Sequence, residues 1–402
     1  HRLTDQFRAS MDMMDKAATT PHRRQNRQTE KWPIGRGKYY EGEFRNSANT
    51  DWSLKANREW AVSIRTKWGN GKPDPVSIPL VIGGDEIINQ RRRKECQDPN
   101  RLPKKVISAR FALANVKDVD RAVSVARTDP DGWRRKSTAA RNRVLSRVTH
   151  ELRKARGDLI GAAAANTGKL FTESDVEVSE AIDFAEFYPR TAIQFDRIHN
   201  LHASGRDVGV VISPWNFPIA IPCGGIIASL AAGNTVIFKP SSEAVLAAWT
   251  LSQCFWRAGV PKTALQFLPC PGGGSGKKLT QHPGVDYVIL TGGTSTGLSI
   301  LGSRPDLYLA AETGGKNATI VTAMADRDQA IGNVIYSAFG NSGQKCSATS
   351  LLILEDEVYT DPAFKKHLVD AARSLKVGSA WDFSNWMGPL IHPPGKVLKR
   401  AL

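Results

Sequence analysis

The residue best suited to nucleophilic chemistry is Cys346, which lies in the polar run Phe339-Gly-Asn-Ser-Gly-Gln-Lys-Cys-Ser-Ala348. Structural cysteines usually lie in apolar stretches, where they pack as small hydrophobic side chains. Cys346 instead follows two glycines and Lys345, and a neighbouring cation favours the reactive thiolate form of a cysteine. The sequence therefore predicts an accessible, reactive thiol at position 346.

Two further side chains could assist such a thiol. Glu312 ends an apolar stretch just before a glycine pair, where a carboxylate can act as a general base with a pKa raised by partial burial. Asn216 lies between Trp215 and Phe217 with a proline on either side, and a rigidly held carboxamide can donate to a developing oxyanion. The plainer alternatives are a cap or ion-pair role for Glu312 and a turn-forming role for Asn216.

Other chemistries lack the motifs that they need. No G-x-S-x-G elbow of a serine hydrolase is present, and no histidine lies in a motif that would pair with a papain-like cysteine. The run Pro271-Gly-Gly-Gly-Ser-Gly-Lys277 resembles a phosphate loop. However, Pro271 replaces the required first glycine and Lys278 replaces the residue that holds magnesium, which argues against an ATPase.

The elements that must position these residues form a repeated pattern after Val208. Short apolar stretches alternate with helical ones such as Glu243–Ala258, which ends at a glycine followed by a proline. This alternation predicts an α/β fold with a doubly wound parallel sheet. The predicted strands are Val208–Ile212, Thr235–Phe238, Leu265–Leu268, Val285–Leu290 and Leu307–Ala311.

A motif of small or polar residues follows each predicted strand. Open α/β sheets bind ligands at this edge, so we expect the motifs to converge on one site. Glycine-rich turns can present N–H groups to a pyrophosphate, and Lys239 could reach a phosphate or ribose hydroxyl. Taken singly, a glycine-rich turn is more often a plain tight turn than a phosphate site, and a lysine at the end of a strand is more often simply exposed to solvent. The motifs are Ser213-Pro-Trp-Asn-Phe-Pro218, Lys239-Pro-Ser-Ser-Glu243, Pro269-Cys-Pro-Gly-Gly-Gly274, Thr291-Gly-Gly-Thr294 and Glu312-Thr-Gly-Gly-Lys316.

Upstream of this region the pattern is weaker. Residues 1–75 are polar and rich in turn formers, and we expect an irregular N-terminal extension. A short strand is predicted at Ser77–Ile82, followed by helices at Val116–Ala126, Ala139–Ala165 and Val176–Thr191.

Composition is that of an ordinary globular protein with room for two or more domains, with 402 residues of which 41% are hydrophobic. No apolar run approaches the ~20 residues that span a bilayer, and the N-terminus lacks the hydrophobic segment of a signal peptide. Five scattered cysteines without a C-x-x-C motif predict reduced thiols in a reducing compartment. They also argue against a structural zinc, since the histidines form no ligand-spaced cluster.

The net charge of +16 has two alternative explanations. Much of it lies in Arg91–Lys94 and in Trp133–Leu159, where Val148 and Leu152 belong to an apolar set at helical spacing. The charge could be the solvated face of helices or a nucleic-acid surface. We favour the first, because aromatic residues are not interleaved with the charges and no DNA-binding motif is present. Basic charge could also attract anionic substrates or cofactors.

Taken in order, the motifs resemble those of the aldehyde dehydrogenase superfamily. Glu312 and Cys346 are separated by 34 residues, as in that family. The resemblance runs from roughly Leu80 to the end and is strongest over 208–388. The matching elements are Pro214-Trp-Asn-Phe-Pro218, Lys239-Pro, Thr291-Gly-Gly, Glu312-x-Gly-Gly-Lys316 and Gly343-Gln-x-Cys346.

Within the superfamily, three stretches resemble the glutamate-γ-semialdehyde (Δ1-pyrroline-5-carboxylate) dehydrogenases. They are Gly343-Gln-Lys-Cys-Ser-Ala348, Ser213-Pro-Trp-Asn-Phe-Pro-Ile-Ala220 and Glu180-Ala-Ile-Asp-Phe184. Residues 49–60 also resemble the segment that leads into this domain in bifunctional proline utilization A proteins.

The resemblance implies an enzyme that oxidises glutamate γ-semialdehyde to glutamate with NAD, or with NADP. In this scheme Cys346 attacks the aldehyde, Asn216 and the Cys346 N–H hold the oxyanion, and Glu312 activates the water that releases the acid. Lys345 and Ser347 would bind the carboxylate end of the substrate, and no metal takes part. The implied coenzyme-binding residues are Ser213, Trp215, Lys239, Ser242, Gly272, Gly274, Thr291, Gly292, Gly293 and Gly314.

The resemblance also implies a domain organisation. A dinucleotide-binding domain would span 76–313, with 196–207 as a candidate oligomerisation arm, and a partial catalytic domain would span 314–402. We expect a homo-oligomer in the cytoplasm, or in the mitochondrial matrix of a eukaryote, with a small aldehyde as partner rather than a membrane or a nucleic acid.

Two departures from the family pattern leave alternatives open. Ser242 stands where an acidic residue usually binds the adenosine ribose, so preference for NAD or NADP is open. The sequence also stops before the family's Glu-x-Phe motif, substrate anchor loop and oligomerisation strand, so we expect a C-terminally incomplete chain. The alternatives are a dehydrogenase of another small aldehyde, such as succinate semialdehyde, or a truncated, non-catalytic relative that binds nucleotide or nucleic acid.

Overall fold

The computed structural model describes residues 2–16, 23–31, 44–69 and 74–401, and a seven-stranded sheet is its largest feature. The strands are β2 (Leu80–Ile82), β3 (Asp85–Ile87), β6 (Val208–Ile212), β7 (Thr235–Lys239), β8 (Leu265–Phe267), β9 (Tyr287–Gly292) and β10 (Tyr308–Thr313). They lie in the order β10-β9-β6-β7-β8-β2-β3. Strands β10 to β8 are parallel, and β2 and β3 are added antiparallel at one edge. The five strands predicted after Val208 are present, with ends shifted by at most two residues.

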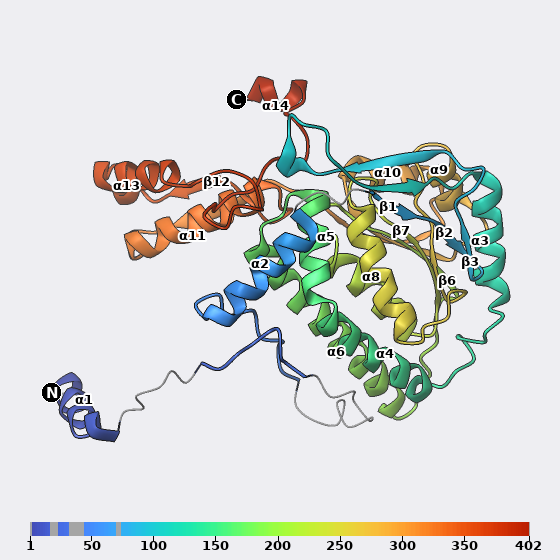
Figure 1. The fold of residues 1–402 in the computed structure, drawn as a ribbon, viewed down its shortest axis with the longest axis horizontal. Coiled ribbons are helices and arrows are strands. Elements are labelled where there is room, and N and C mark those ends of the chain that lie inside the picture. The colour runs from blue at the N-terminus through green and yellow to red at the C-terminus, as the bar shows by residue number, and fades with distance from the viewer. Residues whose placement is uncertain (1, 17–22, 32–43, 70–73, 402) are drawn as a thin grey trace.

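Helices cover both faces of this sheet. They are α3 (Val116–Thr128), α4 (Thr138–Lys154), α5 (Arg156–Thr167), α6 (Phe171–Arg197), α7 (Ala220–Ala231), α8 (Val245–Arg257), α9 (Ser275–Gln281) and α10 (Thr294–Ser303). In β6, Val210 packs into a core with α3, α9 and α10, whereas its neighbour Val211 packs into a core with α4 to α8. A parallel sheet buried on both faces defines the doubly wound α/β class, so the predicted fold class is confirmed (Figure 1).

The order of the strands reverses next to β6. From β6 the chain adds β7 and β8 on one side, and then returns to add β9 and β10 on the other side. The connections therefore leave β6 in opposite directions, which opens a crevice at the carboxyl ends of β6 and β9.

A smaller unit begins after Lys316, whereas Ala380 and Trp381 further along the chain pack into a core of the larger body. A two-stranded parallel sheet of β11 (Asn317–Val321) and β12 (Thr349–Leu354) packs with α11 (Arg327–Phe339) and α13 (Pro362–Arg373). Figure 1 shows α11, β12 and α13 extending from one side of the larger body. The short helix α12 (Asp356–Tyr359) packs against β12 and α13, and α14 (Lys396–Ala401) lies apart from them in Figure 1. The separate core of the smaller unit consists of Val321, Ile331, Ile335, Val358 and Phe364.

The expectation of an irregular extension over residues 1–75 is wrong for two segments, α1 (Arg2–Met11) and α2 (Lys55–Gly69). Helix α1 has no buried residue, whereas α2 packs against α5 and buries Ala61 and Ile64. The close approach depends on Gly161 of α5, because a Cβ there would overlap the ring of Trp68 in α2. The apolar spacing of α2 is diluted by charged residues, which hides the helix in the sequence.

Three upstream predictions need correction. The strand predicted at 77–82 is interrupted by Pro79, which has no N–H to donate. Its first half is β1 (Val76–Ile78), which joins β5 (Ile107–Ala112) and β4 (Arg93–Gln97) in a separate sheet of order β1-β5-β4. The helix predicted at 139–165 is divided at Ala155 into α4 and α5, and the one predicted at 176–191 extends to the full length of α6.

Within these described ranges, no helix has an apolar stretch long enough to cross a lipid bilayer. No cluster of three or more histidine, cysteine, aspartate or glutamate side chains in the same ranges could hold a metal ion.

Candidate active site

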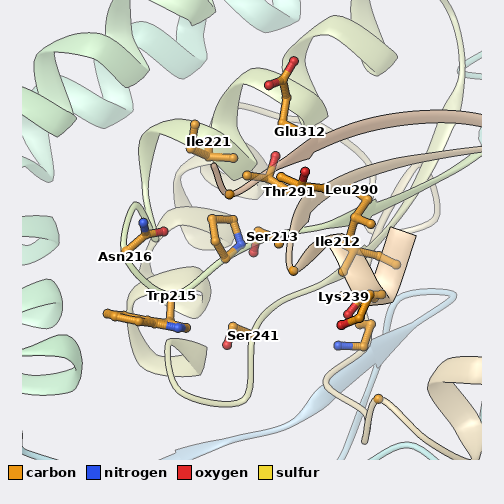
Figure 2. Close-up of a pocket in the computed structure, with 18 of the residues that line it drawn as sticks. Ile212, Ser213, Trp215, Asn216, Ile221, Lys239, Ser241, Leu290, Thr291 and Glu312 are labelled. Atoms are coloured by element: carbon orange, nitrogen blue, oxygen red, sulfur yellow. The ribbon is translucent and has the colours of Figure 1, made fainter. Parts of the chain in front are cut away.

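A cavity of about 890 Å³ lies at the carboxyl edge of the large sheet, where β6 and β9 are neighbours. This is the place where the strand order reverses, and its volume is typical of sites for cofactors and small ligands. Figure 2 shows side chains from the ends of β6, β7, β9 and β10 gathered around it.

The cavity brings together most of the side chains that the sequence predicted for one site. Its lining includes the nucleophile candidate Cys346 and both candidate assistants, Glu312 and Asn216. Gly274 and Ser347 are not part of the lining. The other predicted residues that line the cavity are Ser213, Trp215, Lys239, Ser242, Gly272, Thr291, Gly292, Gly293, Gly314 and Lys345.

The loop that carries Cys346 joins α11 to β12 through a sharply bent turn. Asn341, Ser342 and Gly343 have φ angles of 50°, 58° and 70°, so three consecutive residues lie in the left-handed region. For residues other than glycine this conformation costs about 1–3 kcal/mol each and persists only where the surroundings enforce it. Backbone strain is therefore stored at Asn341 and Ser342, five and four residues before the thiol.

Contacts from two other elements hold this loop. The N–H of Asn341 donates to Glu173 Oε1 of α6 at 2.5 Å. Asn317 Nδ2 of β11 donates to the carbonyl oxygens of Cys346 at 2.6 Å and Ala348 at 3.1 Å. These bonds supply the enforcement that the strained turn requires, and they fix the backbone on either side of the thiol.

Cys346 differs from the other four cysteines in its environment. It is exposed, whereas Cys96, Cys223, Cys254 and Cys270 are buried. Burial raises the pKa of Cys96 and Cys254 to about 12, and it also raises the pKa of the other two buried thiols. A thiol with a raised pKa is protonated at neutral pH and unreactive, which excludes the four buried cysteines and leaves the exposed Cys346 as the candidate nucleophile.

Alkylation should therefore label one cysteine in the folded protein. With iodoacetamide at about pH 8, we expect a mass increase of one adduct, located by peptide mapping to the peptide that contains Cys346, because the other thiols are inaccessible and protonated. In denaturant the same reagent should add five groups, which serves as the control. Rapid labelling of a second cysteine without denaturant would contradict this picture.

Asn216 lies in the turn after β6 and reaches the nucleophile loop. Its Nδ2 donates to the carbonyl oxygen of Gln344 at 2.9 Å. A carboxamide nitrogen has two N–H groups, so this bond orients the side chain and leaves the second N–H for another acceptor. The N–H of Cys346 has no acceptor within the described residues. Both donors of the expected oxyanion site are therefore available.

Glu312 departs from expectation in one respect. The side chain lines the cavity from β10, but it is exposed rather than partly buried, and Figure 2 shows its carboxylate directed away from Ser213 and Lys239. Glu312 lies on β10, an edge strand of the large sheet in which most residues are exposed within the described structure. Within the described part of the chain the carboxylate has no hydrogen-bond or ion-pair partner, so it is free to bind water.

The ammonium of Lys345 contacts two other side chains of the site. Its ammonium lies 3.6 Å from Glu173 Oε1 and 5.1 Å from the centre of the Tyr336 ring. The sequence suggested that an inward-pointing Lys345 would favour the thiolate of Cys346. Pairing with Glu173 instead offsets its charge.

The coenzyme candidates line the opposite part of the cavity. Lys239 is buried, and its ammonium makes one weak contact, 3.4 Å to the Pro240 carbonyl, with no anionic partner among the described residues. Helix α10 begins at Thr294 after the N-cap Gly293, which offers no side-chain cap, so the N–H groups of Thr294 and Ser295 have no acceptor within the described residues. An unpaired ammonium and an uncapped helix N-terminus fit the phosphates of a dinucleotide.

Ser242 and its neighbour Glu243 bear on coenzyme preference. Both line the cavity, and Glu243 pairs with Lys94 at 2.9 Å and with His392 at 3.2 Å. Its carboxylate is therefore already engaged, and the position that usually carries the acidic residue has only a hydroxyl. Preference for NAD or NADP stays open.

Several residues of the site were not predicted from the sequence. Glu173 and Asn317 anchor the nucleophile loop but lie far from Cys346 in the chain, so no local pattern links them. Ser295 and Thr296 line the cavity at the start of α10. The turn Thr291–Gly297, predicted as a phosphate-binding feature, was the available signal for those two.

Many basic side chains of the segments 91–94 and 133–159 form hydrogen bonds or ion pairs within the protein. Arg91 forms two 2.8 Å bonds with Asp118, and Arg147 donates to the Ala258 carbonyl at 2.8 Å. The buried Arg156 pairs with Asp175 at 2.6 Å. These contacts support the interpretation of this charge as part of ordinary helix packing.

Comparison with known proteins agrees with the geometry. The family model described as "Aldehyde dehydrogenase family" matches residues 88–396. A 1-pyrroline-5-carboxylate dehydrogenase of Geobacillus kaustophilus is 33% identical over 368 residues, which cover 87% of this chain and 70% of that protein.

Two solved structures are similar throughout most of the chain. Proline utilization A from Bdellovibrio bacteriovorus has a TM-score of 0.82 and 30% identity, covering 90% of this chain and 38% of that one. A 1-pyrroline-5-carboxylate dehydrogenase from Thermus with bound NAD has a TM-score of 0.81 and 30% identity, covering 87% of this chain and 70% of that one.

Proposed function

Because the chain belongs to the aldehyde dehydrogenase family, we propose that it oxidises glutamate γ-semialdehyde to glutamate with a nicotinamide dinucleotide. The observation that carries the proposal is the convergence of Cys346, Asn216 and Glu312 on one cavity at the switch point of the sheet. The names of the similar enzymes, 1-pyrroline-5-carboxylate dehydrogenase, support the choice of substrate.

The first step is attack of the Cys346 thiolate on the aldehyde carbon. A new carbon–sulfur bond forms while the carbonyl π-electrons move to oxygen, giving a thiohemiacetal oxyanion. The second N–H of the Asn216 carboxamide and the Cys346 N–H donate to this oxygen. Since Gln344 already orients the carboxamide, little reorganisation is needed when the charge develops.

The dinucleotide, when bound, supplies the hydride acceptor that allows the thiohemiacetal to become a thioester. In this chain Lys239 and the first turn of α10 would hold its phosphates, and Thr291, Gly292 and Gly293 at the end of β9 would lie alongside. NAD is the proposed coenzyme, with NADP as the alternative.

The last step is hydrolysis of the thioester. Glu312 takes a proton from a water molecule, the hydroxide adds to the acyl carbon, and the thiolate of Cys346 leaves with glutamate released. An exposed carboxylate without a protein partner suits this role, because it can exchange its proton with solvent between turnovers.

The substrate choice can be tested by comparing two aldehydes. We expect kcat/KM for glutamate γ-semialdehyde to exceed that for succinate semialdehyde by at least about tenfold, since a site built for a polar substituent rejects analogues that lack it. The measurement is coenzyme reduction at varied aldehyde. The reverse order would support a succinate semialdehyde dehydrogenase. Dinucleotide binding without turnover of any aldehyde would favour the non-catalytic alternative.

The organisation of the protein is part of the same proposal. We divide the chain into a dinucleotide-binding domain at 76–313 and a partial catalytic domain at 314–402, a division supported by the separate core around Ile331 and Val358. Residues 196–207 expose Ile198 and Leu201, which supports an oligomerisation arm in a homo-oligomer. The five free thiols support a reducing compartment, and we propose the cytoplasm.

A further inference from the structure

A buried ion pair lies directly behind the turn that carries Asn216. Lys169 and Glu177 are 2% and 1% exposed, and Lys169 Nζ lies 2.7 Å from Glu177 Oε2. Lys169 precedes α6 and Glu177 lies in its second turn, so the two are brought together by the start of this helix. A pair removed so completely from water must form further hydrogen bonds to offset the loss of hydration.

Those further bonds all go to the Asn216 turn. Lys169 Nζ donates to the backbone carbonyl of Asn216 at 2.9 Å and lies 3.9 Å from the centre of the Phe217 ring. The second oxygen of Glu177, Oε1, accepts the N–H groups of Ile219 at 2.6 Å and Ala220 at 3.0 Å. The pair therefore forms hydrogen bonds with the turn at two places, at Asn216 itself and at the start of α7.

The turn has little else to hold it. Residues 214–218 form no backbone–backbone hydrogen bond in the described structure, and Pro214 and Pro218 have no N–H to offer. The carboxamide–Gln344 bond fixes the side chain of Asn216, but it does not fix the backbone from which that side chain extends. The remaining support for the backbone at Asn216 comes from Lys169.

A second buried ion pair, which joins α5 to α6, serves as a comparison. Arg156 and Asp175 lie 2.6 Å apart, and their side chains are 4% and 1% exposed. Their other bonds go to Ser179 and Thr50, and none of these residues lines the cavity. The two pairs are similarly buried, but only Lys169 and Glu177 contact the turn of the proposed oxyanion donor.

We infer that Lys169 and Glu177 are positioning residues that set the distance between the Asn216 carboxamide and the oxyanion formed on Cys346. The inference rests on the proposed function. One helical turn before Glu177, Glu173 accepts the Asn341 N–H of the nucleophile loop. The first two turns of α6 therefore hold both loops whose separation decides whether the oxyanion meets its donor.

The test is a double-mutant cycle on the rate of the first turnover. Asn216→Ala should lower the rate of coenzyme reduction by about 10²–10³-fold, as expected for loss of an oxyanion donor. Glu177→Gln should lower it by about 10- to 100-fold through displacement of that donor. In the Asn216→Ala background, Glu177→Gln should cost less than about threefold, because the group that it positions is absent.

Two further measurements separate positioning from a merely structural role. Alkylation of Cys346 by iodoacetamide forms no oxyanion, so its rate should be the same in Glu177→Gln and the unaltered protein. Asp175→Asn, in the comparison pair, should lower the melting temperature about as much as Glu177→Gln but leave the first-turnover rate unchanged. If Glu177→Gln fails to fold, Lys169→Met replaces it in the cycle, because it preserves the shape of the stem.

The outcomes are distinct. Losses that add in the double variant, a slowed alkylation, an equal loss of rate in Asp175→Asn, or full activity in folded Lys169→Met would each overturn the inference while leaving the proposed function intact. Absence of aldehyde turnover in the unaltered protein would overturn the proposed function and this inference with it.

Discussion

Replacing Cys346 with alanine is expected to lower kcat for aldehyde oxidation by about 10⁴-fold or more, because the covalent route needs a thiolate at this position. No other cysteine can substitute, since the remaining four are buried and their pKa values are raised. The measurement is coenzyme reduction with glutamate γ-semialdehyde under saturating conditions. Binding of the dinucleotide, followed by fluorescence titration, should be retained.

A matched control is available in the buried cysteines. Cys254 lies in α8 away from the cavity, and Cys254→Ala should leave kcat unchanged while lowering stability modestly. Turnover by Cys346→Ala at a rate near that of the unaltered protein would show that the chemistry does not pass through a thioester on this residue.

Replacing Glu312 with glutamine should lower steady-state kcat by about 10²–10⁴-fold, the usual contribution of a general base. The first turnover should remain fast, because the acylation half of the reaction does not use this carboxylate. We therefore expect a burst of reduced coenzyme of one equivalent per active site, followed by slow release. Mass spectrometry of the quenched protein should find the acyl group on the peptide that contains Cys346.

Asp306→Asn provides the control for Glu312→Gln. Asp306 is an exposed carboxylate just before β10 and does not line the cavity, so its loss should leave both phases unchanged. If the Glu312→Gln variant lacks the burst, the carboxylate acts in acylation rather than in hydrolysis of the thioester. If the variant has normal steady-state turnover, Glu312 has no role in the mechanism.

The sequence predicts the large sheet well because its signals are local. Strand β6 is a run of five apolar or small residues bounded by polar ones, and Ser213 follows it directly. Each motif then lies at the same edge, because parallel strands bring their carboxyl ends together. This geometry explains why Asn216, Lys239 and Thr291, so far apart in the chain, line one cavity.

What the sequence does not predict depends on contacts between distant residues. The exposure of Glu312 follows from the position of β10 at the edge of the sheet, and the local sequence does not specify that position. The partner of Lys345 is Glu173, on a helix in the other half of the chain. Lys169 and Glu177 carry no pattern that separates them from surface charges, since their burial depends on how α6 packs against the start of α7.

The reacting groups also stand on hydrophobic cores of very different size. Asn216 follows a strand that packs into the two extensive cores of the large sheet, whereas the Cys346 loop joins α11 and β12, which share the small core around Ile331 and Val358. Small cores with few apolar contacts open at a lower free energy than large ones. On warming, the loop that carries Cys346 would separate from Asn216 while most of the chain is still folded. For the part of the chain that the structure describes, we therefore expect catalytic competence to be lost on warming before the large sheet unfolds.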